Sequence, residues 1–263
     1  ELEVEKELGL DGKEQIEQYG VEPFIERCKA NVWKYKGMWE EFSETVGFWA
    51  DMENPYVTYY DDFIESEWWA LKTIWDKGLL YKGFKIVPYC PRCGTPLSSH
   101  EVAQGYKDVK ERSAIVRFKV KGEDAYFLAW TTTPWTLPGN MGITVDSEFI
   151  YAVVEANNEK LVMAKELVDQ VMKKAGIEEY KIIKTFKGSQ LEGVLCKHPF
   201  LDRTSKVVLG SEDTVKVDLE MGTGAVHTAP GYGKEDYLCG LKNGLDIVVT
   251  VDAKGHQTEG AGP

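Results

Sequence analysis

Apolar residues at three- and four-residue spacing fill the first third of the chain and predict helices there. One helix is predicted from Pro23, which suits a first helical position, to Gly47, through Phe24, Cys28, Val32, Tyr35, Trp39, Phe42 and Val46. A second is predicted from Asp61 or Asp62 to Gly78, through Trp68, Trp69, Ile74 and Trp75. Residues 84–89 then predict a short strand.

From about Glu111 the period changes to that of strands. Val116, Phe118 and Val120 alternate with charged residues, residues 121–124 predict a turn, and 125–130 the partner strand. Further strands are predicted at 149–155, 160–164, 180–186, 206–209 and 247–251, with one helix at 166–175. Many short strands with few helices predict an α+β protein whose second part is a compact, mainly antiparallel β-barrel with flanking helices. The predicted division is residues 1–96, a linker at 97–112, and the barrel at 113–263.

Composition and charge narrow the kinds of partner. With 263 residues, 43% apolar content and a mean hydropathy of −0.33, a soluble globular protein is expected. No apolar run approaches the roughly 18 residues that a membrane helix needs, and residues 1–7 lack the features of a signal peptide, so a cytoplasmic location is expected. Because the chain does not begin with Met, we expect a piece of a longer polypeptide. The net charge of −12 argues against a broad grip on phosphate backbones, but allows capture of a single nucleic-acid end.

The segment Trp130-Thr-Thr-Thr-Pro-Trp-Thr-Leu-Pro-Gly-Asn140 follows a predicted strand and is rich in hydroxyls. Thr131, Thr132 and Thr133 can each donate and accept hydrogen bonds. Pro134 and Pro138 cannot continue a central strand, so the chain must leave the sheet here. One isolated threonine would be explained by local hydrogen bonds, but this grouping favours a functional role.

A second polar segment runs from Gly222 to Tyr237, and its glycines allow close approach of the backbone. His227 falls within a short predicted strand, and Asp236 in the first turn of a helix predicted at 234–243 and ended by Gly244. A structural histidine and an acid that favours the helix dipole would explain each residue alone. Taken together, the two segments predict the two halves of one polar pocket.

Cys90-Pro-Arg-Cys93 is a knuckle that can offer two thiolates to a metal. Structural zinc takes four ligands; His100 is a possible third, and the rest would lie beyond residue 263. Metal binding by Cys90 and Cys93 is therefore left open. An odd total of five cysteines favours a reducing compartment over a disulfide framework.

Motifs along the whole chain resemble isoleucyl-tRNA synthetase. Besides the two polar segments these are Phe48-Trp-Ala-Asp51, Asn54-Pro-Tyr56, Glu65-Ser-Glu-Trp-Trp69, Asp76-Lys-Gly-Leu-Leu-Tyr-Lys-Gly83 and Tyr89 to Ala103. The resemblance implies that residues 1 to about 95 are a helix-rich part of a Rossmann-type α/β catalytic domain. The remainder would be the editing insertion, connective polypeptide 1, which hydrolyses mischarged Val-tRNA(Ile). The His-Ile-Gly-His and Lys-Met-Ser-Lys-Ser signatures are absent from this sequence, so aminoacylation and ATP binding are expected of the parent enzyme only.

The resemblance also implies roles for residues of the pocket. Asp236 would bind the substrate ammonium, while His227 and Thr131–Thr133 would form the side-chain pocket, with Thr133 and His227 as the steric filter. Further substrate contacts are expected from Trp130, Asn140, Gly222, Thr223, Gly224, Ala225, Thr228 and Tyr237. No threonine has an obvious base beside it, so covalent catalysis is not expected. Editing needs no cofactor; the expected partners are the 3′ end of tRNA(Ile) charged with valine and the rest of the synthetase, with no membrane.

Two other functions stay open on the sequence. The chain could be a non-catalytic module that binds a tRNA end or a protein partner. It could also be a valyl-type editing domain that hydrolyses Thr-tRNA, in which case its pocket would need a hydrogen-bonding partner for the substrate hydroxyl.

Overall fold

The computed structural model describes residues 1–262 and divides into two compact units. The first comprises residues 1–85 and 92–94, and the second comprises residues 86–91 and the chain from Thr95 onward. Within the described residues, no helix is long and apolar enough to cross a membrane.

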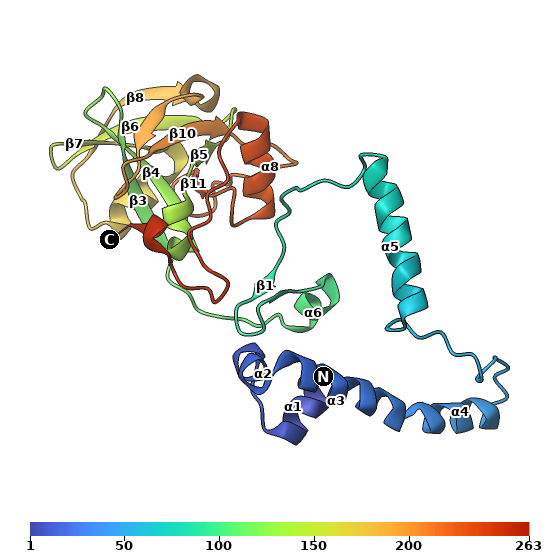
Figure 1. Ribbon diagram of the computed structural model, residues 1–263. Helices are drawn as coiled ribbons and strands as arrows, with labels where there is room; N and C mark the ends of the chain where they lie inside the picture. Colours follow the sequence, from blue (N-terminus) through green and yellow to red (C-terminus); the bar gives the residue numbers. More distant parts are fainter. Residues whose placement is uncertain (263) are drawn as a thin grey trace. The chain divides into compact units, whose positions relative to one another are not determined.

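The first unit is made of helices (Figure 1). They are α1 (Leu2–Leu8), α2 (Lys13–Tyr19), α3 (Val21–Lys34), α4 (Lys36–Thr45) and α5 (Asp61–Asp76). The single helix predicted from Pro23 is wrong, because the chain breaks into α3 and α4 at Tyr35. The end of α5 is as predicted, with Gly78 at a φ of 68°. Residues 1–85 form no strand, so this stretch does not by itself build the parallel sheet that the resemblance implies.

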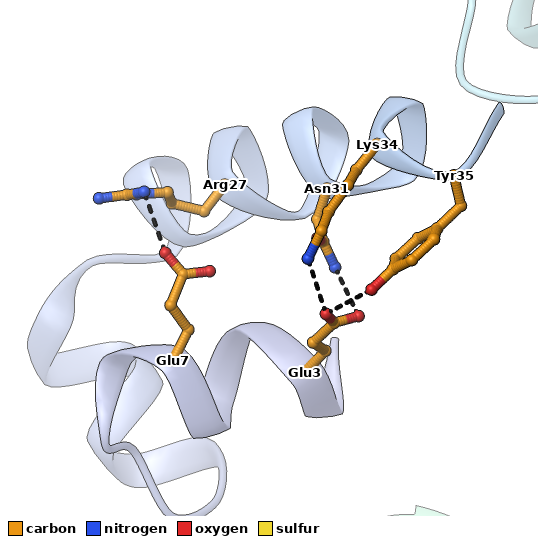
Figure 2. A network of polar contacts seen from close by, with 6 residues as sticks. All are labelled: Glu3, Glu7, Arg27, Asn31, Lys34 and Tyr35. Atoms are coloured by element: carbon orange, nitrogen blue, oxygen red, sulfur yellow. Dashed lines mark hydrogen bonds and ion pairs between the residues drawn. The ribbon is translucent and has the colours of Figure 1, made fainter. Parts of the chain in front are cut away.

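Polar contacts rather than a core join α1 to α3 (Figure 2). The Glu3 carboxylate accepts hydrogen bonds from the Tyr35 hydroxyl (2.8 Å), Asn31 (3.2 Å) and Lys34 (3.3 Å), and these bonds lower its pKa. Arg27 pairs with Glu7 at 3.2 Å. Only Val4 and Phe24 are buried among the described side chains of this unit. Its large apolar side chains are instead widely exposed: Trp39, Phe48, Trp49, Trp68, Trp69 and Trp75.

The second unit contains a closed six-stranded barrel. Its strands are β3 (Ala114–Val120), β4 (Tyr126–Thr131), β5 (Gly142–Val145), β9 (Leu195–Lys197), β10 (Thr204–Leu209) and β11 (Ala225–Thr228). They pair in the order β11-β5-β10-β9-β3-β4, and a parallel contact between Trp130 and Val226 closes the ring. Antiparallel pairs predominate, which confirms the predicted fold class; the parallel pairs are β4–β11, β5–β10 and β4–β7.

Three more strands extend the sheet from β4, namely β7 (Glu159–Ala164), β6 (Ile150–Ala156) and β8 (Lys181–Lys187). The main core lies between these strands, the barrel and the helix α7 (Val168–Lys174). Its largest fully buried side chains are Phe118, Phe127, Ile143, Tyr151, Met163 and Met172. Burial of this kind of side chain stabilises a fold by about 1.5–3 kcal/mol each, so the barrel holds most of the chain's hydrophobic stabilisation.

On the flank of the barrel lies α8 (Lys234–Asn243), beside β5 and β11 (Figure 1). Cys239 packs it against Val208 and Val215 in a second, small core. The helix ends at Gly244, which takes a φ of 65°, so its predicted bounds and stop are confirmed. Together with β11 it sets the position of Asp236.

Outside α8, the sequence predicts the longer strands and misses the shortest. A strand at 84–89 is wrong, because Pro88 offers no donor and only Tyr89–Cys90 (β1) pairs, with Thr95–Pro96 (β2). A strand at 247–251 is also wrong: a single bridge joins Val251 to Gln257, and the Asp252 carboxylate accepts from the amides of Lys254 and His256 in a turn. The strands β5 and β9 are not predicted, because four and three residues show no period. The remaining short helices are α6 (Ser99–Gln104), η1 (Pro134–Gly139), η2 (Lys165–Leu167), η3 (Gly188–Leu191) and η4 (Glu259–Ala261).

Candidate functional site

The closing contact of the barrel brings the two polar segments together. Because Val226 on β11 pairs with Trp130 on β4, the threonines that follow β4 lie beside the end of β11. Between them is a pocket of about 250 Å³. It is lined by Trp130, Thr131, Thr132, Thr133, Trp135, Thr136, Val226, His227, Ala229, Tyr232 and Asp236. A pocket of this volume is at the lower end of small-ligand sites.

The three consecutive threonines differ in what they offer to a ligand. Thr131 is 5% exposed, and its hydroxyl accepts a hydrogen bond from the Thr133 amide at 3.1 Å. Thr132 and Thr133 are exposed at the pocket, where their side chains can meet a ligand. Thr131 therefore shapes the turn out of β4, while the next two threonines face outward.

The His227 ring is held from both sides by hydrogen bonds. Its Nδ1 lies 2.7 Å from Asn140 Nδ2, and its Nε2 lies 2.8 Å from Thr136 Oγ1. Asn140 Nδ2 also donates to the Gly142 carbonyl at 2.8 Å, and a carbonyl can only accept, so the amide group is oriented with Nδ2 toward the ring. His227 Nδ1 is then an acceptor, and the proton of the neutral ring is on Nε2.

Burial lowers the pKa of His227 to about 4, and the nearby His198 lowers it further. His198 is itself buried; its Nε2 donates to the Leu137 carbonyl at 2.9 Å, and desolvation lowers its pKa as well. The imidazole of His227 is thus neutral at physiological pH. Since both ring nitrogens already have partners, His227 offers shape to the pocket rather than an accessible base.

Asp236 points from the first turn of α8 toward the same pocket. Its Oδ1 accepts from the Ala229 amide at 2.9 Å, which ties the end of β11 to the helix. Burial raises the pKa of this carboxyl, an effect that the backbone hydrogen bonds oppose. Within residues 1–262 no lysine, arginine or histidine pairs with it. Asp236 is therefore a desolvated carboxyl at a pocket, without a cation of its own.

The glycines of the second segment bring its backbone close to its neighbours. Gly222 and Gly224 take φ values of 85° and 68°, a region that side chains disfavour. A Cβ on Gly222 would lie 2.9 Å from the Trp130 ring, and one on Gly224 would lie 2.3 Å from the Ala164 Cβ. These glycines let the chain enter β11 close behind the pocket wall.

Several residues with expected substrate contacts lie outside the pocket lining. The buried hydroxyl of Thr223 donates to the Leu128 carbonyl at 2.8 Å, and that of Thr228 lies 2.5 Å from the Thr144 hydroxyl. Asn140 is fully buried behind His227. The others outside the lining are Gly222, Gly224, Ala225 and Tyr237. Their contacts with a substrate stay predictions, while their observed partners belong to the protein.

The structure adds pocket residues that the sequence reasoning did not select. Thr136, Trp135 and Tyr232 lie within the two quoted segments but were passed over, and Val226 and Ala229 flank His227 and Thr228. The Tyr232 ring packs on Gly139, where a Cβ would lie 2.2 Å from it, and meets Trp135 edge-on at 5.5 Å. The doublet Pro138–Gly139 was a usable signal for such a close aromatic contact.

The described residues do not complete a metal site. Cys90 and Cys93 supply two sulfurs, and residues 1–262 contain no group of three or more His, Cys, Asp or Glu side chains that could hold an ion. A structural zinc needs four ligands. The zinc site at Cys90 and Cys93 thus stays a prediction for a longer polypeptide, and no step is assigned to a metal.

Fold and pocket are those of a synthetase with an inserted barrel, and comparison with known families gives the class. Residues 1–195 match the family described as tRNA synthetases class I (I, L, M and V), and the chain belongs to this family. Among its relatives, the chain is 52% identical over 268 residues to an isoleucine–tRNA ligase of Clostridium novyi, covering all of this chain and 25% of that protein. It is 47% identical over 263 residues to isoleucine–tRNA ligase 2 of Bacillus cereus, again spanning 25% of the relative. The chain thus spans about a quarter of the ligases that it matches.

Solved structures with a related arrangement are editing domains. The leucyl-tRNA synthetase domain described as GlLeuRS-CP1 covers 48% of this chain and 52% of its own, with a TM-score of 0.39 and 22% identity. The editing domain of the P. knowlesi cytosolic leucyl-tRNA synthetase covers 53% and 64%, with a TM-score of 0.43 and 12% identity.

Proposed function

We propose that the pocket at β4, β11 and α8 hydrolyses the ester of valine mistakenly attached to tRNA(Ile). The observation that carries this proposal is the unpaired Asp236 carboxyl at a small pocket whose opposite wall is threonine hydroxyls and a neutral histidine. The ligase relatives give the tRNA and the amino acid of the parent.

Asp236 acts as the anchor in this proposal. The α-ammonium of an aminoacyl ester forms a charge-assisted hydrogen bond with the carboxylate, which fixes the ester carbonyl within reach of water. An ammonium also removes the penalty that burial places on the charged carboxylate. Water then adds to the carbonyl, oriented by threonine hydroxyls and backbone amides, and valine leaves the tRNA hydroxyl. A vicinal hydroxyl of the terminal ribose assists, as the family resemblance implies.

The pocket separates valine from isoleucine by size. One methylene in an apolar pocket gives only about 1–3 kcal/mol, and isoleucyl-tRNA synthetase facing valine is a known example of this limit. A second site that admits only the smaller residue multiplies the selectivity. In this site Thr133 and His227 form the filter, and Thr136 adds to the same wall.

The neutral, doubly bonded His227 favours valine over threonine as the rejected amino acid. A valyl-type site would reward the threonine hydroxyl with a hydrogen bond, and neither ring nitrogen is available for one. Comparing hydrolysis of Val-tRNA and Thr-tRNA tests this choice; faster hydrolysis of Thr-tRNA would favour the valyl-type function.

The decisive experiment is single-turnover deacylation of Val-tRNA(Ile) by Asp236→Asn, in this chain and in the full-length ligase. A hydrogen bond to a charged group is worth about 1.5–3 kcal/mol, so the rate should fall roughly 10- to 150-fold. Glu235→Gln removes a neighbouring exposed charge from the same helical turn and should retain the rate.

Stability provides the second readout for Asp236→Asn. A raised folded-state pKa means that the folded protein favours the protonated carboxyl, so ionisation above that pKa costs stability. Asparagine is neutral and still offers an oxygen to the Ala229 amide. The melting temperature should therefore not decrease. Undiminished deacylation would remove Asp236 from the central role, and no deacylation by the unchanged chain and ligase would favour a non-catalytic tRNA-end or partner-binding module.

The remaining properties belong to the proposed parent. Aminoacylation with ATP, zinc at Cys90 and Cys93, and residence in the cytoplasm are proposed for the full-length ligase. The rest of that polypeptide is the partner of this chain, and the charged 3′ end of tRNA(Ile) is its substrate.

A further inference from the structure

Ser205 on β10 begins a line of hydrogen bonds that reaches the pocket from the barrel interior. Its side chain is fully buried, and its hydroxyl donates to Asn140 Oδ1 at 2.6 Å. Asn140 Nδ2 donates to His227 Nδ1, and His227 Nε2 donates to the Thr136 hydroxyl. The Thr136 hydroxyl donates in turn to the Thr133 carbonyl at 2.8 Å. We refer to Ser205, Asn140, His227 and Thr136 as the relay.

Every bond of the relay runs in the same direction, and both of its ends fix that direction. At one end the Thr133 carbonyl can only accept. Near the other, the Gly142 carbonyl can only accept from Asn140 Nδ2, which leaves Asn140 Oδ1 facing Ser205. That oxygen has Ser205 as its hydrogen-bond donor, and a buried acceptor left without one is costly. The serine hydroxyl thus completes the set of partners that keeps the carboxamide in one orientation.

We propose that Ser205 is a positioning residue, which orients Asn140 and through it keeps His227 in the tautomer with its proton on Nε2. The consequence for the site is that neither ring nitrogen meets the ligand and the wall sorts side chains by shape. This consequence for activity rests on the proposed editing function, whereas the tautomer itself does not.

Nitrogen-15 NMR of the histidine rings tests the tautomer in the whole chain. The sequence holds only four histidines, so the His227 resonances can be assigned by comparison with His227→Gln. In the unchanged protein the protonated nitrogen should be Nε2. In Ser205→Ala the carboxamide loses one partner and can turn over, so a measurable fraction of the Nδ1-protonated ring should appear. Ser205→Thr, which keeps a hydroxyl, should restore the single tautomer.

Two further variants separate positioning from general stability. Thr214→Val removes another buried hydroxyl, which bonds with Ser211 outside the relay, and should leave the tautomer unchanged. Asn140→Asp replaces the donor that faces Nδ1 with an acceptor and should move the proton to Nδ1. If Ser205→Ala keeps the tautomer of the unchanged protein, the role of Ser205 is overturned; if Asn140→Asp keeps it, Asn140 does not orient the ring.

The activity readout is the ratio of Val-tRNA(Ile) to Ile-tRNA(Ile) hydrolysis. This ratio should fall about fivefold in Ser205→Ala, the amount that one net buried hydrogen bond represents, and should recover in Ser205→Thr. A tautomer change in a protein that hydrolyses neither ester would support the positioning role and overturn the proposed function. A changed ratio with an unchanged tautomer would overturn the positioning role alone.

Discussion

At the scale of single residues, the site combines two titratable groups that burial affects in opposite senses. Desolvation favours the uncharged form of each, so it lowers the pKa of His227 and raises that of Asp236. The histidine has its neutral form completed by neighbours, whereas the carboxyl has one printed partner, the Ala229 amide, and no cation. This difference is why we assign shape to the first residue and ligand binding to the second.

The folded chain should lose stability in acid because of His227. Its folded-state pKa is about 4, below the value of about 6.5 expected when unfolded, so the unfolded chain binds more protons between the two. Its contribution should decrease by about 2 kcal/mol from about pH 7 to about pH 5. Urea unfolding of the unchanged chain and of His227→Gln at both pH values measures the difference.

His198 keeps its own, smaller acid dependence in His227→Gln, since burial lowers its pKa also. A His198→Gln variant is the matched control for that share. Should His227→Gln lose as much stability on acidification as the unchanged chain, His227 would not be buried and neutral in solution.

At the scale of elements, the barrel depends on short strands that the sequence hides. The long strands β3 and β4 alternate visibly, and α8 is predicted to the residue from its glycine stop. β5 is buried on both faces, so Gly142, Ile143, Thr144 and Val145 show no alternation. The pocket residues predicted from motifs meet because β4 and β11 pair in parallel at one position, a long-range contact that no local pattern encodes. Asn140 is an instructive case: the motif marks it, but only the packing shows that it acts on His227.

The entry into β11 should be sensitive to one methyl group at Gly224. Alanine there must adopt a φ of 68°, which costs about 1–2 kcal/mol, and its Cβ would meet that of Ala164 at 2.3 Å, which adds about 1–3 kcal/mol of overpacking. Gly122→Ala is the control, because Gly122 has a φ of 80° and open space around it. Urea midpoints should fall further for Gly224→Ala than for Gly122→Ala. Equal losses would show that the contact with Ala164 is not tight.

At the scale of the whole chain, hydrophobic burial is distributed very unevenly. The unit of residues 1–85 and 92–94 buries only Val4 and Phe24, while the other unit contains a continuous core of strands and α7. Isolated helices of the lengths of α1 and α2, seven residues each, are not stable in water without packing. The first unit therefore depends on polar contacts such as those of Glu3, which water weakens.

Hydrogen exchange should accordingly show two levels of protection in this chain. Amides of β3, β4 and β6 lie in the buried core and should exchange only on global unfolding, whereas amides of α1 to α5 should exchange by local opening. Mass spectrometry of peptides from the intact chain measures both at once, and α8, which packs through Cys239, serves as a helical control inside the second unit. Slow exchange in α8 together with fast exchange in α5 would show that packing, rather than helical structure itself, sets the difference. If α3 to α5 are as protected as β4, the polar contacts of the first unit stabilise it far more than exposed ion pairs and hydrogen bonds usually do.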